Sequence, residues 1–100
     1  MRHTLAAIAV LLAATTASAQ TSPDGQNWET PMSAGDRAYQ LGRYAEAERF
    51  FTTALERAER AGGAQDPRVA LSLGLLASAY QAGGSYGKAE PLLGRALGIA

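Results

Sequence analysis

The acidic residues that could do chemistry lie in one stretch, and their spacing decides what they can do. Glu46 and Glu48 are two positions apart, so on a helix they point to different faces and cannot work as a paired acid and base. Glu56 and Glu59 lie nearer to one face, but the charges around them are typical of a solvated helix surface. These carboxylates therefore form no acid–base pair.

Cysteine and histidine, which are common nucleophiles, bases and metal ligands, are almost absent from the sequence. The chain has no cysteine, and its one histidine, His3, lies near the N-terminus. Gly62-Gly63 and Gly83-Gly84 follow no predicted strand, so they indicate turns and helix ends rather than phosphate-binding loops. Lys88 stands near a predicted helix start, where we expect it to be solvated. We expect no enzymatic activity, no cofactor and no metal.

The N-terminus has the three-part pattern of a secretory signal peptide. Arg2-His3 gives a basic start, residues 5–14 are almost wholly apolar, and Ala17-Ser18-Ala19 is the small-x-small site that signal peptidase cuts. We predict a signal peptide over residues 1–19 that is cleaved after Ala19; the alternative is an uncleaved amphiphilic helix. The apolar run is shorter than the roughly 20 residues that span a bilayer, so no stable membrane anchor is expected after cleavage.

The net charge and the lack of cysteine limit the kinds of partner and the cellular location that the sequence predicts. The formal net charge of the 100-residue chain is zero, so it has no basic field for nucleic acid or for an anionic membrane. Without cysteine an exported chain gains no disulfide and no lipid anchor at the cleavage site. We expect an exported protein, either periplasmic or secreted into the medium.

Residues 20–32 are rich in polar and turn-forming residues and show no apolar period over most of their length, which predicts a flexible leader. Pro23-Asp24-Gly25 is a turn signal within it. Trp28 is the exception, because large aromatic side chains are rarely left fully exposed. We expect Trp28 to fold back over a neighbouring helix; ligand binding is the alternative.

Two stretches of the remaining chain are close copies of each other. Residues 38–48 (AYQLGRYAEAE) are echoed by residues 79–90 (AYQAGGSYGKAE), and each continues into a matching tail. Tyr39 aligns with Tyr80 before the turn and Tyr44 with Tyr86 after it, so the offset between the copies grows by one. This predicts one extra turn residue in the second copy. Self-similarity at a fixed period is the mark of a stacked-repeat architecture, which usually provides a surface for holding something.

The pattern predicts four helices in residues 33–100, arranged as two antiparallel helix-turn-helix repeats of about 33–62 and 66–100. The first helix covers about Met32–Gln40, with Ser33 and Asp36 as a capping box. The second covers about Tyr44–Ala61 and carries its apolar residues on one stripe. The other two begin at Pro67, after a capping Asp66, and at Ser85 or Tyr86.

The apolar faces predict how these helices pack. The third helix is apolar on two faces, so we expect it to be sandwiched between the second and the fourth. One of its faces carries Val69, Leu73, Leu76, Ala77 and Tyr80, and the other carries Leu71, Leu75 and Ala79. The apolar side of the fourth helix carries Ala89, Leu92, Leu93, Ala96, Leu97 and Ile99.

These residues resemble the tetratricopeptide repeat, in which small residues mark tight helix crossings and larger ones fill the spaces between them. The resemblance covers about residues 33–100 and implies an all-α solenoid fragment that binds protein. The packing positions that it implies are Gly42, Tyr44, Ala47, Phe51 and Ala54 in the first copy and Leu76, Tyr80, Gly84, Tyr86, Ala89, Leu93 and Ala96 in the second.

The period and the motifs are similar to the long-repeat branch found in kinesin light chain and many bacterial proteins. The matching segments are Asp66-Pro67, Ser72-Leu73-Gly74-Leu75-Leu76-Ala77 and Ala89-Glu90-Pro91-Leu92-Leu93. That branch often has asparagines where this chain has Gly74 and Leu75, and they hold a peptide backbone in the concave groove. The remaining groove candidates here are Asp36, Arg37, Gln40, Ser78 and Gln81.

Three functions are compatible with this sequence, in decreasing order of support. The first is a small exported interaction module that holds a protein or peptide partner and also self-associates. The second is the N-terminal repeat segment of a larger periplasmic protein with a downstream sensor or catalytic domain. The third, a small hydrolase or binding enzyme, has the least support because the reactive side chains are missing.

Overall fold

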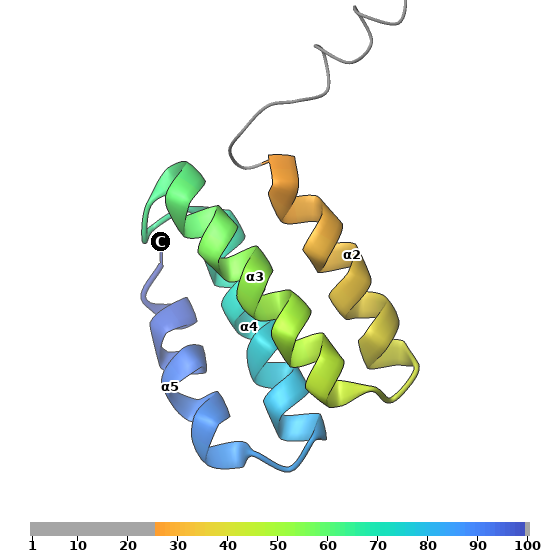
Figure 1. The fold of residues 1–100 in the computed structure, drawn as a ribbon. Coiled ribbons are helices and arrows are strands. Elements are labelled where there is room, and N and C mark those ends of the chain that lie inside the picture. Colours follow the sequence, from red (N-terminus) through yellow and green to blue (C-terminus); the bar gives the residue numbers. More distant parts are fainter. Residues whose placement is uncertain (1–25, 100) are drawn as a thin grey trace, which may run out of the picture.

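The computed structural model describes residues 26–99, and these form an all-α array of two helical hairpins (Figure 1). Helix α2 covers Gln26–Gln40 and α3 covers Tyr44–Gly62, which together make the first hairpin. Helix α4 covers Pro67–Ala82 and α5 covers Tyr86–Leu97, which make the second. The expected fold class, two antiparallel helix-turn-helix repeats, is confirmed. The predicted signal peptide, with its cleavage residues Ala17 and Ala19, lies outside the described residues.

Helix α2 begins earlier than the sequence pattern predicted. It starts at Gln26 and not at Met32, so the second half of the predicted leader is helical. Ser33 therefore lies inside the helix, and the predicted capping box with Asp36 is wrong.

Pro31 lies inside α2 and has no N–H to donate to the carbonyl of Asn27 one turn earlier. The Arg57 Nη1 donates to that carbonyl oxygen at 2.7 Å. A side chain of α3 thus supplies the hydrogen bond that proline removes, and the helix continues through Pro31.

Helix α3 packs on both α2 and α4 through one apolar stripe. Its buried residues are Ala47, Phe51, Ala54, Leu55 and Ala58. Gly35 of α2 lies directly against the ring of Phe51: a Cβ placed on Gly35 would be 2.6 Å from the Phe51 Cδ1. The two helices approach this closely because Gly35 has no side chain.

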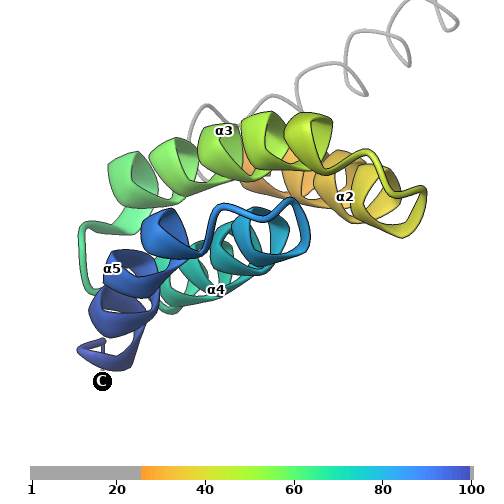
Figure 2. The same cartoon turned by 90° about the horizontal axis from the view of Figure 1, so that it is seen from below.

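Helix α4 starts where the sequence predicted. The Asp66 carboxylate accepts a hydrogen bond from the Arg68 backbone N–H at 2.8 Å, and Pro67 occupies the first helical position. The helix packs against α3 on one side and α5 on the other, as expected of a helix apolar on two faces. Seen from below, α2 and α3 form one layer and α4 and α5 the next (Figure 2).

The two hairpins share one register, which corrects the alignment drawn from the sequence. Aligning the last residue of α2, Gln40, with the last residue of α4, Ala82, also aligns the first residues of α3 and α5, Tyr44 and Tyr86. The turn hydrogen bonds match as well: the Arg43 N–H donates to the Ala38 carbonyl, and the Ser85 N–H donates to the Tyr80 carbonyl.

Both turns also place a glycine at positive φ, Gly42 at 77° and Gly84 at 89°. The second copy therefore has no extra turn residue. In this register Tyr80 is structurally equivalent to Ala38. Tyr39 and Tyr80 are the same residue type, but they occupy different positions of the repeat.

Candidate interaction surface

Polar side chains gather on one side of α2. Ser33, Asp36, Arg37 and Gln40 follow each other at steps of three, one and three, which places them on one side of a helix. All four are exposed, and together they line an open depression of about 370 Å³. The structure thus brings together three of the five groove residues predicted from the sequence.

The other two predicted groove residues lie on α4 and do not line that depression. The Ser78 hydroxyl donates its proton to the Gly74 carbonyl of its own helix at 3.1 Å, so this proton is not available to a bound peptide. Gln81 is exposed. In the common register Ser78 corresponds to Asp36, and Gln81 corresponds to Tyr39.

A partly buried polar contact joins α2 to α4. The Trp28 Nε1–H donates to the Ser72 hydroxyl oxygen at 2.8 Å, and that hydroxyl donates to the Arg68 carbonyl at 2.8 Å. Met32 is also buried beside Ser72, with 3.8 Å between its sulfur and the hydroxyl oxygen. Trp28 therefore packs across the two repeats, in line with the expectation that it covers a neighbouring helix.

Leu71 is a surface residue that the sequence pattern missed. It was expected on a buried face of α4, yet 50% of its surface is exposed. Leu75 and Ser78, one and two turns further along, are half-buried. The signal that could have found Leu71 is this spacing, because it shares a stripe with Ser78, which was assigned to the groove. The stripe gives the surface an apolar part beside the polar side of α2.

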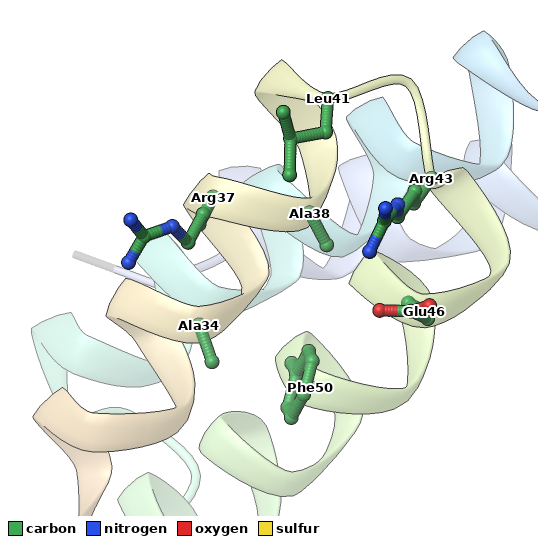
Figure 3. Close-up of a pocket in the computed structure, with 7 residues that line it drawn as sticks. All are labelled: Ala34, Arg37, Ala38, Leu41, Arg43, Glu46 and Phe50. Atoms are coloured by element: carbon green, nitrogen blue, oxygen red, sulfur yellow. The ribbon is translucent and has the colours of Figure 1, made fainter.

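A second depression lies at the free edge of the first hairpin, between α2 and α3 (Figure 3). Figure 3 shows Ala34 and Ala38 facing Phe50 across it, with Leu41 at the end of α2. We call this depression, of about 170 Å³, the edge groove. Its lining residues are Ala34, Arg37, Ala38, Leu41, Arg43, Glu46 and Phe50.

The packing positions implied by the sequence divide into two groups. Most are in or against the core: Ala47, Phe51, Ala54, Leu76 and Ala89 are buried, and Tyr44, Tyr80 and Ala96 are half-buried. Gly42 and Gly84 are the turn residues.

Two of the packing positions on α5 differ from expectation. Tyr86 is 67% exposed and Leu93 is 37% exposed, so the prediction that they fill spaces between helices is wrong. The reason is that α5 is the outer helix of the second hairpin within the described residues, and these side chains lie on its uncovered side.

Two ion pairs stabilise the arrangement away from these surfaces. Arg95 of α5 donates to the Glu59 carboxylate of α3, which ties the two hairpins together. Arg68 binds both oxygens of Asp66, at 2.9 Å each. Hydrogen bonds from the Arg68 side chain and from its backbone lower the pKa of Asp66 from 3.8 to about 2.

Two features are absent from the described residues, a cluster of metal ligands and a membrane-spanning helix. Residues 26–99 contain no group of three or more His, Cys, Asp and Glu residues placed to hold a metal ion. The same segment includes no helix with both the length and the hydrophobicity needed to cross a bilayer.

Comparison with known proteins agrees with the helical-hairpin architecture. The family described as "Tetratricopeptide repeat" matches residues 34–100, which includes the C-terminal part of α2, from residue 34 on, and all of the other three helices. No curated protein and no solved structure matched the chain. Since the family match extends over about two thirds of the sequence, the chain belongs to the tetratricopeptide repeat family.

Proposed function

We propose that this chain is an exported interaction module of the long-repeat branch of its family, which holds a protein or peptide partner on the surface of α2 and α4. Tetratricopeptide repeats are protein–protein interaction modules, and this supports the general class of function. Export is supported by the signal-peptide pattern of residues 1–19. The branch is supported by the long register that relates the two hairpins and by the Asp66-Pro67 helix start.

The observation that carries the proposal is the juxtaposition of a polar and an apolar stripe on neighbouring helices. Asp36, Arg37 and Gln40 line the α2 depression, and Leu71 stands exposed on α4. The Trp28–Ser72 hydrogen bond holds these two helices beside each other. An extended peptide lying on such a surface has hydrogen-bonding groups for its backbone and one exposed leucine for an apolar side chain.

Site-specific photo-crosslinking tests the proposed surface. A photoreactive side chain at Gln40 or Leu71 should capture one partner in extract of the source cells. The same group at Arg60, which is exposed on α3, serves as the control. Arg37→Ala and Leu71→Ala should each weaken that capture. Equal capture from Gln40, Leu71 and Arg60 would show that the surface of α2 and α4 is not the binding surface.

Export is tested separately by N-terminal sequencing of the protein isolated from its source. A mature chain that begins at Gln20 and lies in the periplasm or the medium is the expected result. A chain that keeps residues 1–19 and stays inside the cell would contradict the export proposal without affecting the binding surface.

A second candidate function is a repeat segment within a larger periplasmic protein that has a sensor or catalytic domain downstream. The exposed leucines of α5 favour it, because a third repeat would cover them: Leu93 is 37% exposed and Leu97 is 86% exposed. The coding sequence beyond the codon for Ala100 decides this candidate. An open frame that encodes a further repeat supports it, and a stop codon removes it.

A further inference from the structure

The edge groove of the first hairpin has a counterpart inside the molecule. Because the two hairpins share one register, with Gln40 equivalent to Ala82, each residue that lines the edge groove can be assigned its equivalent in the second hairpin. These equivalents are Leu76, Ala79, Tyr80, Gly83, Ser85, Lys88 and Leu92.

The equivalent face is the one by which the second hairpin packs on the first. Leu76 and Ala79 are buried in the shared core, and Tyr80 and Leu92 pack against it. One close approach is at Gly83: a Cβ there would be 3.5 Å from the Tyr44 Cβ and 3.4 Å from a Glu48 carboxylate oxygen. The edge groove is therefore the first hairpin's version of a face that docks within this molecule.

The receiving face also has an uncovered counterpart. In the shared register Tyr44, Glu48, Phe51 and Leu55 correspond to Tyr86, Glu90, Leu93 and Leu97, which we call the α5 face. Phe51 and Leu55 are 0% and 8% exposed, whereas Leu93 and Leu97 are 37% and 86% exposed. The α5 face thus keeps the apolar character of a receiving face while its large side chains stand open to solvent.

From this pairing we propose that a second copy of the chain docks its edge groove on the α5 face of the first, repeating the contact between the two hairpins. Both halves of the contact are present on every copy. The charges also agree in sign, because the edge groove carries Arg37, Arg43 and Glu46, a net positive charge, and the α5 face carries Glu90. The proposal names the self-association partner of the proposed interaction module, and to that extent it rests on the proposed function.

A contact of this kind is head-to-tail, because it joins two different surfaces. A stack of any number of copies therefore has one uncovered edge groove at one end and one uncovered α5 face at the other. Association therefore continues beyond a dimer as concentration rises. Leu41 of one copy meets Tyr86 of the next, since these residues are the equivalents of Gly83 and Tyr44.

Cysteine cross-linking tests this geometry, because the chain contains no cysteine of its own. Tyr44→Cys with Gly83→Cys in one chain is the internal reference. Its Cβ separation of 3.5 Å lies at the short end of the range for disulfides, so it should close within the chain. The test mixes one full chain carrying Leu41→Cys with another carrying Tyr86→Cys, and repeats the mixture with residues 20–100 alone.

The expected result is a mixed disulfide between the Leu41→Cys and Tyr86→Cys chains. Gln65→Cys, in the exposed α3–α4 turn, is the matched control partner for each. The mixed product should form about tenfold faster than either control product, because docking raises the effective concentration of the two thiols. Formation at the control rate, while the internal reference closes, would overturn the proposal.

Sedimentation of the unmodified chain gives an independent readout. The weight-average mass should rise past that of a dimer with concentration, and Leu97→Glu should weaken association about tenfold while leaving the circular dichroism spectrum unchanged. A chain that stays monomeric, stops at a dimer or ignores Leu97→Glu would overturn the proposal. Photo-crosslinking from Gln40 and Leu71 to a different protein does not depend on this outcome, so failure of the copy–copy contact is distinguishable from failure of the proposed function.

Discussion

At the scale of single residues, the absence of one side chain decides how closely α2 approaches α3. Gly35 faces the ring of Phe51, which is fully buried. Its equivalent in the second hairpin, Ala77, is also small and fully buried. The same position of both hairpins is therefore occupied by a residue with little or no side chain.

Gly35→Ala tests this crossing. The added Cβ would be 2.6 Å from the Phe51 Cδ1, so we expect the free energy of unfolding to fall by about 1–3 kcal/mol despite the better helix propensity of alanine. Gly74→Ala is the matched control, because a Cβ there meets nothing within 4 Å and should stabilise α4 by up to about 1 kcal/mol. Urea unfolding measures both, and equal effects would contradict the tight crossing.

Asp66 gives the chain a stability contribution that depends on pH. Its folded pKa of about 2 lies below the ordinary value of 3.8, so its charged form stabilises the fold above about pH 4. This contribution is lost as pH falls through 2. Asp66→Asn keeps a capping side chain without the charge, so its stability deficit relative to the parent should shrink between pH 4 and pH 2. Thermal melts across this range measure the deficit, and a constant value would contradict the prediction.

At the scale of elements, the first turns of α2 depend on contacts from distant parts of the chain. Arg57 donates to the Asn27 carbonyl that Pro31 leaves free, and Ser72 accepts from Trp28. Both partners lie on other helices. The early start of α2 is thus a tertiary effect that the local sequence does not carry.

Trp28→Phe should cost about 1 kcal/mol, because it removes the hydrogen bond to Ser72 while keeping an aromatic ring in place. Ser72→Ala should cost a similar amount. The double variant should cost clearly less than the two single losses together, since they break the same bond. Thr53→Val, which removes an exposed hydrogen bond within α3, is the control and should change stability little. Additive losses in urea unfolding would contradict a direct Trp28–Ser72 coupling.

The sequence predicted the elements whose signals are local. The start of α4 follows from Asp66 and Pro67, and the buried stripe of α3 follows from its period. The sequence could not predict the start of α2. A proline inside a helix usually interrupts it, and here the helix continues because Arg57, which is distant in the sequence, donates to the carbonyl left without its backbone donor.

The candidate surface was predictable only in part, for a different reason. Asp36, Arg37 and Gln40 share one side of α2 by spacing alone, and the structure groups them. The exposure of Leu71, Tyr86 and Leu93 depends on which helix covers them, and an apolar pattern does not state that. Likewise, the sequence suggested aligning Tyr39 with Tyr80. The hydrogen bonds of the turns define a register that differs from this alignment by one position.

At the scale of the whole molecule, residues 26–99 form a short stack with two unlike ends. One end is the edge groove with two arginines, and the other is the α5 face with exposed leucines. In such a linear array, stability is a sum over repeats and over the contacts between neighbours. Covering either end should therefore add to the stability of the whole.

If copies stack as proposed, the melting temperature should rise with protein concentration, because association favours the folded state. Leu97→Glu should shift this dependence to about tenfold higher protein concentration, while Gln65→Glu, in the exposed turn, should leave it where it is in the parent chain. Differential scanning calorimetry over a series of concentrations gives the answer. A melting temperature independent of concentration in the parent chain would contradict the copy–copy contact.

The place of Trp28 makes this chain its own spectroscopic reporter. It is the one tryptophan in the sequence, and its indole nitrogen belongs to the first hairpin while its hydroxyl partner belongs to the second. Its emission should therefore respond when the hairpins part, even where the helices themselves persist. Fluorescence and far-ultraviolet dichroism followed side by side would then separate undocking of the repeats from loss of helix, without any attached dye.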